Sequence, residues 1–304
     1  MDACLLEFIR MNKPVINSEL TGTRLRDYEM SVEWRDIMNY SAAIGDNNPR
    51  YFDDENPDGI ISHPVYPVAV TWNILGNIRE YVISENFPTE LLLSQVHYTE
   101  HLEIHRPLSS GVQLVIKGRI VAILPHRAGT HVVIRLDARE KEGALLFTEH
   151  IGAMLRGVEC IGGGSGKESL PIVRNASDSD KPCWVNTVSI DPLMPYVYDG
   201  CTDIVFPIHT SARFARMVGL PGIILQGTAT LALAVTELVN RELNSEPARV
   251  RSVSCRFTGM VLPGADISVR MIEKRKNNSG TDLFFDVSNI RGERVISAGC
   301  LFAD

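Results

Sequence analysis

Two segments, one in each half of the chain, are apolar around almost the whole helical circumference. They are PVYPVAVTWNILGNIREYVI at residues 64–83 and GIILQGTATLALAVTELVNREL at residues 222–243. A helix that is apolar all round leaves no face for water and has to be buried. Pro64 and Pro67 suit the first turn of the first segment, because N–H groups there have no partner within the helix. The pattern therefore predicts two buried central helices.

Alternating or β-branched segments surround both predicted helices. Such segments are typical of strands, and Pro, Gly and charged residues separate them. They cover residues 92–105, 112–124, 130–140 and 144–156 in the first half, and residues 249–258, 266–275, 282–289 and 294–303 in the second. Residues 184–191 form a strand or a loop. Each half is therefore predicted to be an α+β unit, in which an antiparallel sheet wraps one long central helix.

A shorter helix and a polar loop precede each central helix. Residues 31–44 begin at Ser31, a suitable N-cap, and carry apolar residues at helical spacing. A loop rich in Asn and Pro follows from Gly45 to about Gly59. In the second half, a short helix at about 192–198 precedes the corresponding loop. The two halves thus share one order of elements.

Two short sequence phrases also recur in the same order. YSAAIGDNNPRYFDD at residues 40–54 corresponds to YVYDGCTDIVFPIHTS at residues 196–211. Further on, Gly-Thr pairs begin strand-like segments at Gly129 and Gly280, 151 residues apart. A weak repeat of ordered phrases indicates a duplicated domain, in which one copy can keep chemistry while the other changes role.

The length of the chain supports two domains. Its 304 residues exceed what one core comfortably holds, and domains of about 150 residues are expected. Residues 159–182 have the composition of a linker, since GGGSG and a run of Ser, Asp and Pro lie within them. We therefore expect an N-terminal domain at 1–158, this linker, and a C-terminal domain at 183–304.

Composition and charge exclude several classes of protein. A net charge of −7 argues against a nucleic-acid partner, which normally meets a basic face. No apolar run reaches the roughly 18–20 residues that span a bilayer. The N-terminal MDACLLEFIRMNK carries charges within its short apolar stretch, unlike a signal peptide, and the C-terminal CLFAD is no known address. A cytoplasmic protein is expected.

The cysteines are scattered and do not form a C-x-x-C pair. This spacing indicates neither a zinc cage nor a redox motif, and it favours free thiols in a reducing compartment. No cofactor and no metal are expected. The six cysteines are Cys4, Cys160, Cys183, Cys201, Cys255 and Cys300.

The segment FPIHTSARFARMVGLPGIILQGTATLAL, which begins at Phe206, resembles the MaoC-like hydratases and dehydratases. That family carries G-D-x-N-P-x-H, followed by a His-Gly pair that opens the central helix. GDNNPRYFD and SHP in the first half resemble the degenerate half of fused members. HYTEHLEIHRPLSSG and CRFTGMVLPG are similar to a family strand that turns at Pro before Gly. The resemblance implies two tandem hot-dog domains over nearly the whole chain.

The resemblance also implies a reaction. In (R)-specific enoyl-CoA hydratases and 3-hydroxyacyl dehydratases, a carboxylate and an imidazole hold one water that adds across an enoyl thioester. A backbone N–H at the start of a buried helix stabilises the enolate oxygen, and the helix dipole adds positive potential. The substrate carrier is coenzyme A or an acyl carrier protein. The expected activity is reversible hydration of an enoyl thioester to a 3-hydroxyacyl thioester.

The family pattern transfers to the second half residue by residue. His209 follows Pro207 and matches the catalytic His. The family Asp position, five residues earlier, is Ile204, so Asp203 is the candidate carboxylate if the loop contains a one-residue bulge. Asp199 is a weaker candidate. A loop-capping role for Asp203 and ordinary loop hydrogen bonding for His209 are the alternatives.

The helix entrance in the second half matches the family in part. Gly227 stands at the oxyanion position, and Gln226 replaces the usual His. Gln can donate a hydrogen bond to a carbonyl but cannot titrate. Close helix packing is the alternative role for Gly227. The other histidines, among them His97, His101 and His150, are expected to be structural.

The first half keeps Asp46 and Asn48, but Tyr51 takes the histidine position. His63 precedes Pro64 and corresponds to the family His-Gly, yet Pro64 has no N–H for an oxyanion. Asp46 and Asn48 are predicted to be structural loop residues, with a vestigial or alternative site as the other interpretation. Asp46, Asn48, Tyr51 and His63 are the candidates for such a secondary site. One working site per chain, in the second half, is expected.

The remaining candidates concern substrate binding. Trp72, Ile74 and Leu75 line an acyl wall or belong to the core. Four arginines either meet carrier phosphates or lie on solvated faces; they are Arg213, Arg216, Arg249 and Arg251.

Two other functions stay open. The chain could be a hot-dog thioesterase or another acyl-thioester enzyme, since the fold hosts several chemistries. It could also be a non-catalytic partner subunit of a hydratase, because both halves lack part of the motif. A monomer or a homodimer of fused double hot-dogs is expected, with neither a nucleic-acid nor a membrane partner.

Overall fold

A computed structural model describes residues 14–84, 86–141, 143–177 and 181–304. The N-terminal segment that argues against a signal peptide, together with Cys4, lies outside the described residues. Among the described residues, none of the helices is both long and apolar enough to cross a membrane.

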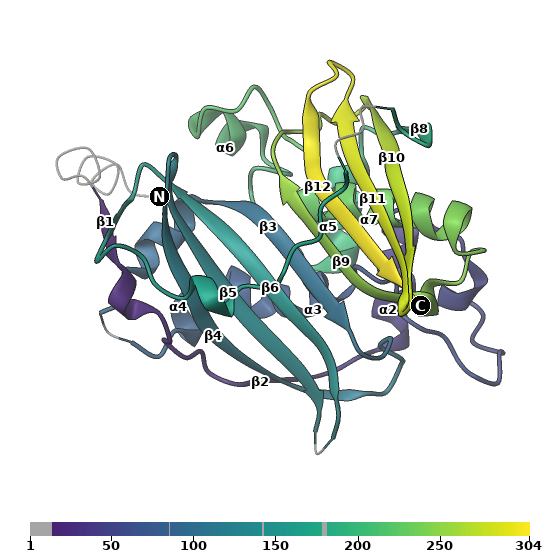
Figure 1. The fold of residues 1–304 in the computed structure, drawn as a ribbon, viewed down its shortest axis with the longest axis horizontal. Coiled ribbons are helices and arrows are strands. Elements are labelled where there is room, and N and C mark those ends of the chain that lie inside the picture. The colour runs from purple at the N-terminus through teal and green to yellow at the C-terminus, as the bar shows by residue number, and fades with distance from the viewer. Residues whose placement is uncertain (1–13, 85, 142, 178–180) are drawn as a thin grey trace.

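One ten-stranded sheet runs through the described part of the chain, with the order β2-β4-β5-β6-β3-β9-β12-β11-β10-β8 (Figure 1). The first five strands in this order come from the first half and the last five from the second. The first-half strands are β2 (Tyr28–Ser31), β3 (Gln95–Ile104), β4 (Gln113–His126), β5 (Gly129–Glu140) and β6 (Leu145–Arg156). The second-half strands are β8 (Trp184–Ser189), β9 (Val250–Phe257), β10 (Asp266–Asn277), β11 (Gly280–Asn289) and β12 (Arg294–Ala303).

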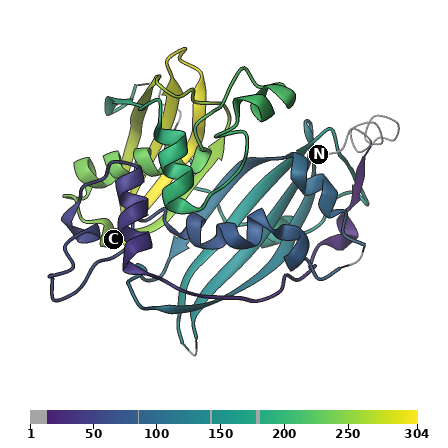
Figure 2. The same ribbon diagram turned by 180° about the vertical axis from the view of Figure 1, so that it is seen from behind.

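The helices lie on one face of this sheet, as Figure 2 shows from behind. The central helices are α3 (Pro67–Gly76), continued by α4 (Ile78–Tyr81), and α7 (Gly227–Glu242). Both are buried over most of their length, as their apolar composition requires. The shorter helices are α2 (Trp34–Ala43), α5 (Met194–Thr202) and α6 (Ala212–Met217). The predicted α+β plan, in which each half combines an antiparallel sheet with a central helix, is confirmed.

Antiparallel pairing of β3 with β9 joins the two half-sheets, with Thr99 opposite Arg256 and Glu103 opposite Ser252. On the helix side, α2 packs against α5. The hydroxyls of Tyr40 on α2 and Tyr198 on α5 lie 3.3 Å apart, and both side chains are fully buried. The two halves therefore share one sheet and one core.

Two expected boundaries differ from the observed ones. Helix α2 begins at Trp34 with Glu33 as its N-cap, rather than at Ser31. Ser31 instead ends β2, opposite Gln113 of β4, because sheet pairing there outweighs the local capping signal. The first central helix is interrupted at Asn77 between α3 and α4. Helix α6 was not expected at all.

The first part of the expected linker packs against the first half. Strand β7 (Glu159–Ile161) pairs in parallel with β1 (Val15–Asn17). Ser165 then forms an isolated bridge with Ile123 on β4. The short 3₁₀ helices are η1 (Ser18–Leu20), η2 (Pro49–Tyr51), η3 (Thr89–Ser94), η4 (Lys167–Ser169) and η5 (Pro247–Arg249).

Candidate functional site

Gln226, Gly227 and Phe257 form what we call the α7 entrance. Gln226 is the N-cap of α7 and Gly227 its first residue. A Cβ atom on Gly227 would lie 3.1 Å from Cδ1 of the Phe257 ring, so a side chain there would force the ring to move. The aromatic ring therefore packs directly over the first turn of the helix, where N–H groups have no partner within the helix.

His209 lies in the loop between α5 and α6, beside the α7 entrance. Its Nδ1 donates a hydrogen bond to the carbonyl oxygen of Ile224 at 2.8 Å. Burial lowers the pKa of His209 to about 4, and the bond to Ile224 acts in the opposite direction. The ring is therefore neutral near pH 7, with its proton on Nδ1 and a lone pair on Nε2. That tautomer is ready to accept a proton.

Asp203 does not lie where a catalytic carboxylate is expected. It is the C-cap of α5, with a left-handed φ of 56°, and its side chain is exposed. Ile204 takes the inward position and is only 4% exposed. Burial raises the pKa of Asp36 and of Asp199, and the charge of Asp203 raises each further, so its close neighbours are carboxylates. No ion pair joins Asp203 to His209, both of which the structure describes.

The side chain of Gln226 is hydrogen-bonded to α5. It is 1% exposed, and its Nε2 donates to the carbonyl oxygen of Pro195 on α5 at 3.0 Å. The amide therefore ties α5 to the start of α7. This hydrogen bond holds the entrance in shape.

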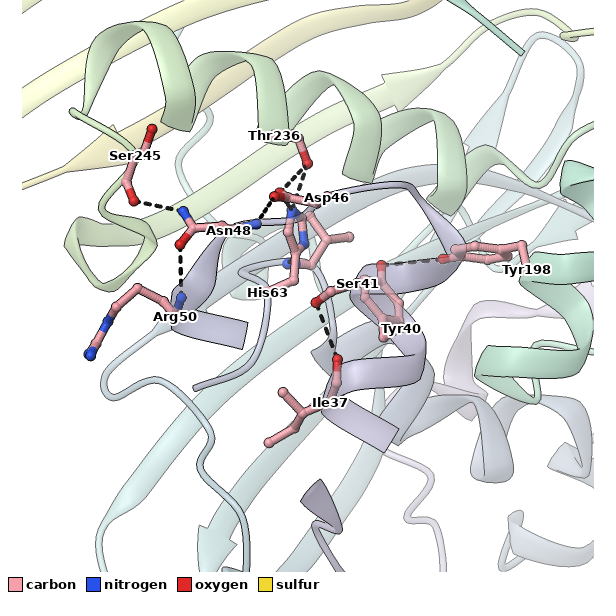
Figure 3. A network of polar contacts seen from close by, with 11 residues as sticks. Ile37, Tyr40, Ser41, Asp46, Asn48, Arg50, His63, Tyr198, Thr236 and Ser245 are labelled. Atoms are coloured by element: carbon pink, nitrogen blue, oxygen red, sulfur yellow. Dashed lines mark hydrogen bonds and ion pairs between the residues drawn. The ribbon is translucent and has the colours of Figure 1, made fainter. Parts of the chain in front are cut away.

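In the first half, Asp46 and His63 meet Thr236 of α7 (Figure 3). The Thr236 hydroxyl donates to Asp46 Oδ2 at 2.8 Å and lies 3.3 Å from His63 Nε2. His63 Nδ1 accepts the N–H of Val65 at 3.1 Å, so its proton is on Nε2. Burial lowers the pKa of His63 to about 3 and raises that of Asp46, which the bonds from Thr236 and Asn48 partly offset.

Asn48 extends this contact to the end of α7. Its Nδ2 donates to the carbonyl oxygen of Ser245 at 2.7 Å, and its own N–H donates to Asp46 Oδ1 at 3.1 Å. Figure 3 shows the chain of contacts from one half to the other. We call Asp46, Asn48, His63, Thr236 and Ser245 the Asp46 network. Its polar atoms form contacts between the two halves, and these contacts hold the halves together.

Tyr51 occupies the position of the family histidine in the first half. The ring is fully buried and packs edge-on against His63, with ring centres 5.7 Å apart. Burial raises the pKa of Tyr51 well above its usual value. A neutral phenol cannot accept a proton as imidazole does. Asp46, Asn48, Tyr51 and His63 are therefore brought together, but in a closed and buried set.

The second-half motif also contacts residues that the sequence did not single out. The Tyr198 hydroxyl lies 3.1 Å from the Thr228 hydroxyl on the first turn of α7 and 3.3 Å from the Tyr40 hydroxyl. These hydroxyls join α2, α5 and α7 immediately behind the α7 entrance. The recurrence of Tyr in both repeated phrases was the available signal, since a tyrosine kept in both copies of a repeat points to a shared core position.

The candidates for substrate binding separate into two groups. Arg249 and Arg251 are engaged by the C-terminal residue Asp304. Arg213 and Arg216 are exposed on α6, the helix that follows His209. Ile74 and Leu75 are buried core residues of α3, and Trp72 is half-buried beside Gly76.

Comparison with known proteins covers both halves. Residues 183–291 match the MaoC like domain, and residues 30–157 match the MFE-2 hydratase 2 N-terminal domain. The peroxisomal enoyl-CoA hydratase 2 of Arabidopsis thaliana is 24% identical over 277 residues, which are 84% of this chain and 86% of that protein.

Two solved structures show the same fold. A MaoC-like dehydratase from Phytophthora capsici superposes with a TM-score of 0.79 at 22% identity, over 93% of this chain and 96% of that one. A Mycobacterium tuberculosis protein described as a double hot-dog gives a TM-score of 0.59 at 14% identity, over 93% and 96%. With both halves matched, the expected resemblance is confirmed, and the chain is a fused double hot-dog that belongs to the MaoC-like hydratases and dehydratases.

Proposed function

We propose that this chain catalyses the reversible hydration of an enoyl thioester to a 3-hydroxyacyl thioester at the α7 entrance. The observation that carries the proposal is the state of His209: a neutral imidazole, fixed through Nδ1, with Nε2 open as a base beside the start of a buried helix. Membership of a family of hydro-lyases supports the reaction class. The working domain is then 183–304, and residues 1–158 and the linker 159–182 support it.

In the dehydration direction, His209 Nε2 takes the proton α to the thioester carbonyl. The electron pair of that C–H bond forms the double bond while the C–O bond breaks, and the hydroxyl oxygen takes up a proton from an acid and leaves as water. Negative charge that develops on the carbonyl oxygen is met by the N–H of Gly227 and by the positive end of the α7 dipole. One such donor contributes about 2.7–4 kcal/mol to lowering the barrier.

Asp203 stays in this proposal as the sequence-based candidate for the carboxylate that shares a water with His209. Its place one residue before Ile204 supports that role, whereas its exposure requires a bridging water molecule. Gln226 supports the site indirectly through Pro195. Asp46, Asn48, Tyr51 and His63 are proposed to be structural.

The direct test replaces His209 by Ala and measures hydration of crotonyl-CoA. We expect a loss of about 10²–10⁴-fold, because a positioned general base contributes that much. His105→Ala, an exposed histidine on the first half, is the matched control and should keep wild-type activity. Activity of H209A within about threefold of wild type would remove His209 from the mechanism.

One observation favours a second function. A buried Ile204 at the carboxylate position leaves the site without its usual acid, and hot-dog sites also host thioester hydrolysis. Incubation with a panel of acyl-CoAs, followed by measurement of free thiol, separates the two. Thiol release without hydration would favour a thioesterase.

The carrier, location and assembly complete the proposal. The substrate is an acyl-CoA or an acyl-carrier-protein thioester, and the exposed Arg213 and Arg216 offer charges for its phosphates. The enzyme is proposed to act in the cytoplasm as a monomer or a homodimer. Light scattering and imaging of a tagged chain test these two points.

A further inference from the structure

A buried carboxyl pair lies where the two half-sheets meet. Glu100 on β3 is 1% exposed and Glu149 on β6 is 0% exposed. Among the described residues, neither forms an ion pair with an arginine or lysine. Burying a carboxyl without a cation is expensive, and an apolar side chain would pack there without that penalty. Such groups are found where a site needs them.

His97 connects this pair to the α7 entrance. Its Nε2 lies 3.1 Å from Glu100 Oε2, and its side chain is 25% exposed. Its ring centre lies 4.5 Å from that of Phe257, the ring that packs over Gly227. An imidazole with one edge toward the site and one nitrogen on a buried carboxyl has the arrangement of an acid–base group and its orienting partner.

The backbone of β3 is irregular at this point. The register between β3 and β6 shifts between His97 and Thr99, while Glu100 stays opposite Ile151 of β6 and Cys255 of β9. An irregularity of this kind changes the direction of a side chain and is frequent next to active sites. It places His97 and Glu100, three residues apart, on the same face of the sheet.

The protonation states suit a transferable proton. Burial lowers the pKa of His97 to about 4, and a backbone hydrogen bond at Thr99 acts in the opposite direction. Burial raises the pKa of Glu100 and of Glu149 well above the usual value, and the charge of Glu100 adds to the effect on Glu149. The Glu100–Glu149 pair therefore keeps a proton near neutral pH, and the His97 imidazole can receive it.

We propose that His97, backed by Glu100, is the group that exchanges a proton with the substrate hydroxyl, opposite His209, in place of the carboxylate missing at Ile204. This inference rests on the proposed hydratase function. Glu100 Oε2 lies beside Nε2, so the substrate meets the ring at Nδ1, in place of the backbone hydrogen bond at Thr99.

The step balances in the dehydration direction. His209 Nε2 takes the α-proton, and its electron pair forms the C=C bond. His97 gives its proton to the hydroxyl oxygen as the C–O bond breaks, and water leaves. Glu100, with Glu149 behind it, returns a proton to His97. The carboxyl pair then regains a proton from solvent, and His209 releases the α-proton to solvent.

Two assays on the same full-length samples separate the roles of the two histidines. The first is hydration of crotonyl-CoA. The second is exchange of the α-protons of butanoyl-CoA in D₂O, followed by mass spectrometry. Butanoyl-CoA has no hydroxyl, so its exchange needs His209 but not His97.

We expect His97→Gln to lose about 10²–10⁴-fold in hydration and Glu100→Gln at least about tenfold, with α-proton exchange within threefold of wild type. H209A should lose both activities. Retained exchange shows that the site is folded and intact. The matched control is the His101–Glu103 pair, 3.2 Å apart on the opposite face of the same strand. His101→Gln and Glu103→Gln should keep both activities.

The remaining outcomes of the two assays would overturn the role of His97. Hydration by H97Q and E100Q within threefold of wild type overturns this inference, and so does an equal loss of hydration and exchange. If Asp203→Asn shows the selective loss instead, Asp203 is the acid and His97 is not. An inactive wild type overturns the proposed function as well, whereas an active wild type that needs His209 but not His97 overturns this inference alone.

Discussion

The two halves use the same motif in opposite ways. The first half keeps the carboxylate of G-D-x-N-P and buries it against Thr236 and His63 of the Asp46 network. The second half keeps the histidine, with Nε2 open, and replaces the carboxylate by a buried Ile204. A motif match in a duplicated chain therefore does not identify a working site. What distinguishes the halves is whether the polar atoms are already used within the protein.

The largest expected effect concerns the Asp46 network. Thr236→Val removes the hydroxyl that donates to Asp46 Oδ2 and that lies beside His63 Nε2. The buried side chains of Asp46 and His63 then lack this partner. We expect the free energy of unfolding to fall by about 1–3 kcal/mol, with kcat unchanged. Urea denaturation and hydration kinetics measure the two quantities.

Thr230→Val is the matched control on the same helix. Its hydroxyl donates only to the carbonyl oxygen of Gln226 within α7, so the variant should lose less stability. Equal losses in the two variants would show that the Asp46 network adds nothing between the halves.

The next effect is the part of the pH dependence of stability that comes from His63. Burial also lowers the pKa of four other histidines, His97, His131, His150 and His209, which act with the same sign. The folded pKa of His63, about 3, lies below the value of about 6.5 for an unfolded chain, so the unfolded state binds more protons between these values. Stability from this group is complete above about pH 6.5 and falls as the pH drops toward 3, by about 1.4 kcal/mol per unit. His63→Gln should therefore lose about 2 kcal/mol less than wild type between pH 7.5 and 5.

Urea titrations of both proteins at several pH values measure this difference. Comparison with the variant is needed because Glu100 and Glu149, whose pKa values are raised, act with the opposite sign. Parallel curves for wild type and H63Q would show that His63 keeps its usual pKa in the folded protein.

The smallest effect tests whether Gly227 at the α7 entrance contributes to the reaction, with Gly76 at the end of α3 as the comparison. Gly227→Ala places a methyl group 3.1 Å from Cδ1 of Phe257, and we expect a loss of about tenfold in hydration, or about 1.4 kcal/mol, as the ring is displaced. Gly76→Ala meets Trp72 Nε1 at a similar 3.2 Å on α3, far from His209 in sequence, and should keep its activity. Equal activities of G227A and G76A would separate Gly227 from the reaction.

Much of the fold follows from local patterns. The apolar runs predicted α3 and α7, and alternation predicted all eight long strands to within a few residues. Helix α6 was missed because its six residues, ARFARM, make fewer than two turns, which is too short for a helical period to show. Strand β2 was missed because its four residues gain their structure from β4, far along the chain.

The site was less predictable, because it depends on the direction of single side chains. Whether Asp203 or Ile204 points inward is decided by a left-handed φ that no sequence pattern announces. Thr236 reaches Asp46 across 190 residues. Glu100 did carry a signal: the alternation of EHLEI at residues 100–104 places this acidic residue on the same face as the buried Leu102 and Ile104, which is unusual enough to mark a special position.

Because β3 pairs continuously with β9, each half of the chain protects a sheet edge of the other. Either half made alone would present a long, unpaired strand whose N–H and C=O groups invite pairing with other chains, and would thus be prone to aggregate. Whatever part each half has in the reaction, it therefore also covers the sheet edge of its neighbour and so protects it from pairing with other chains.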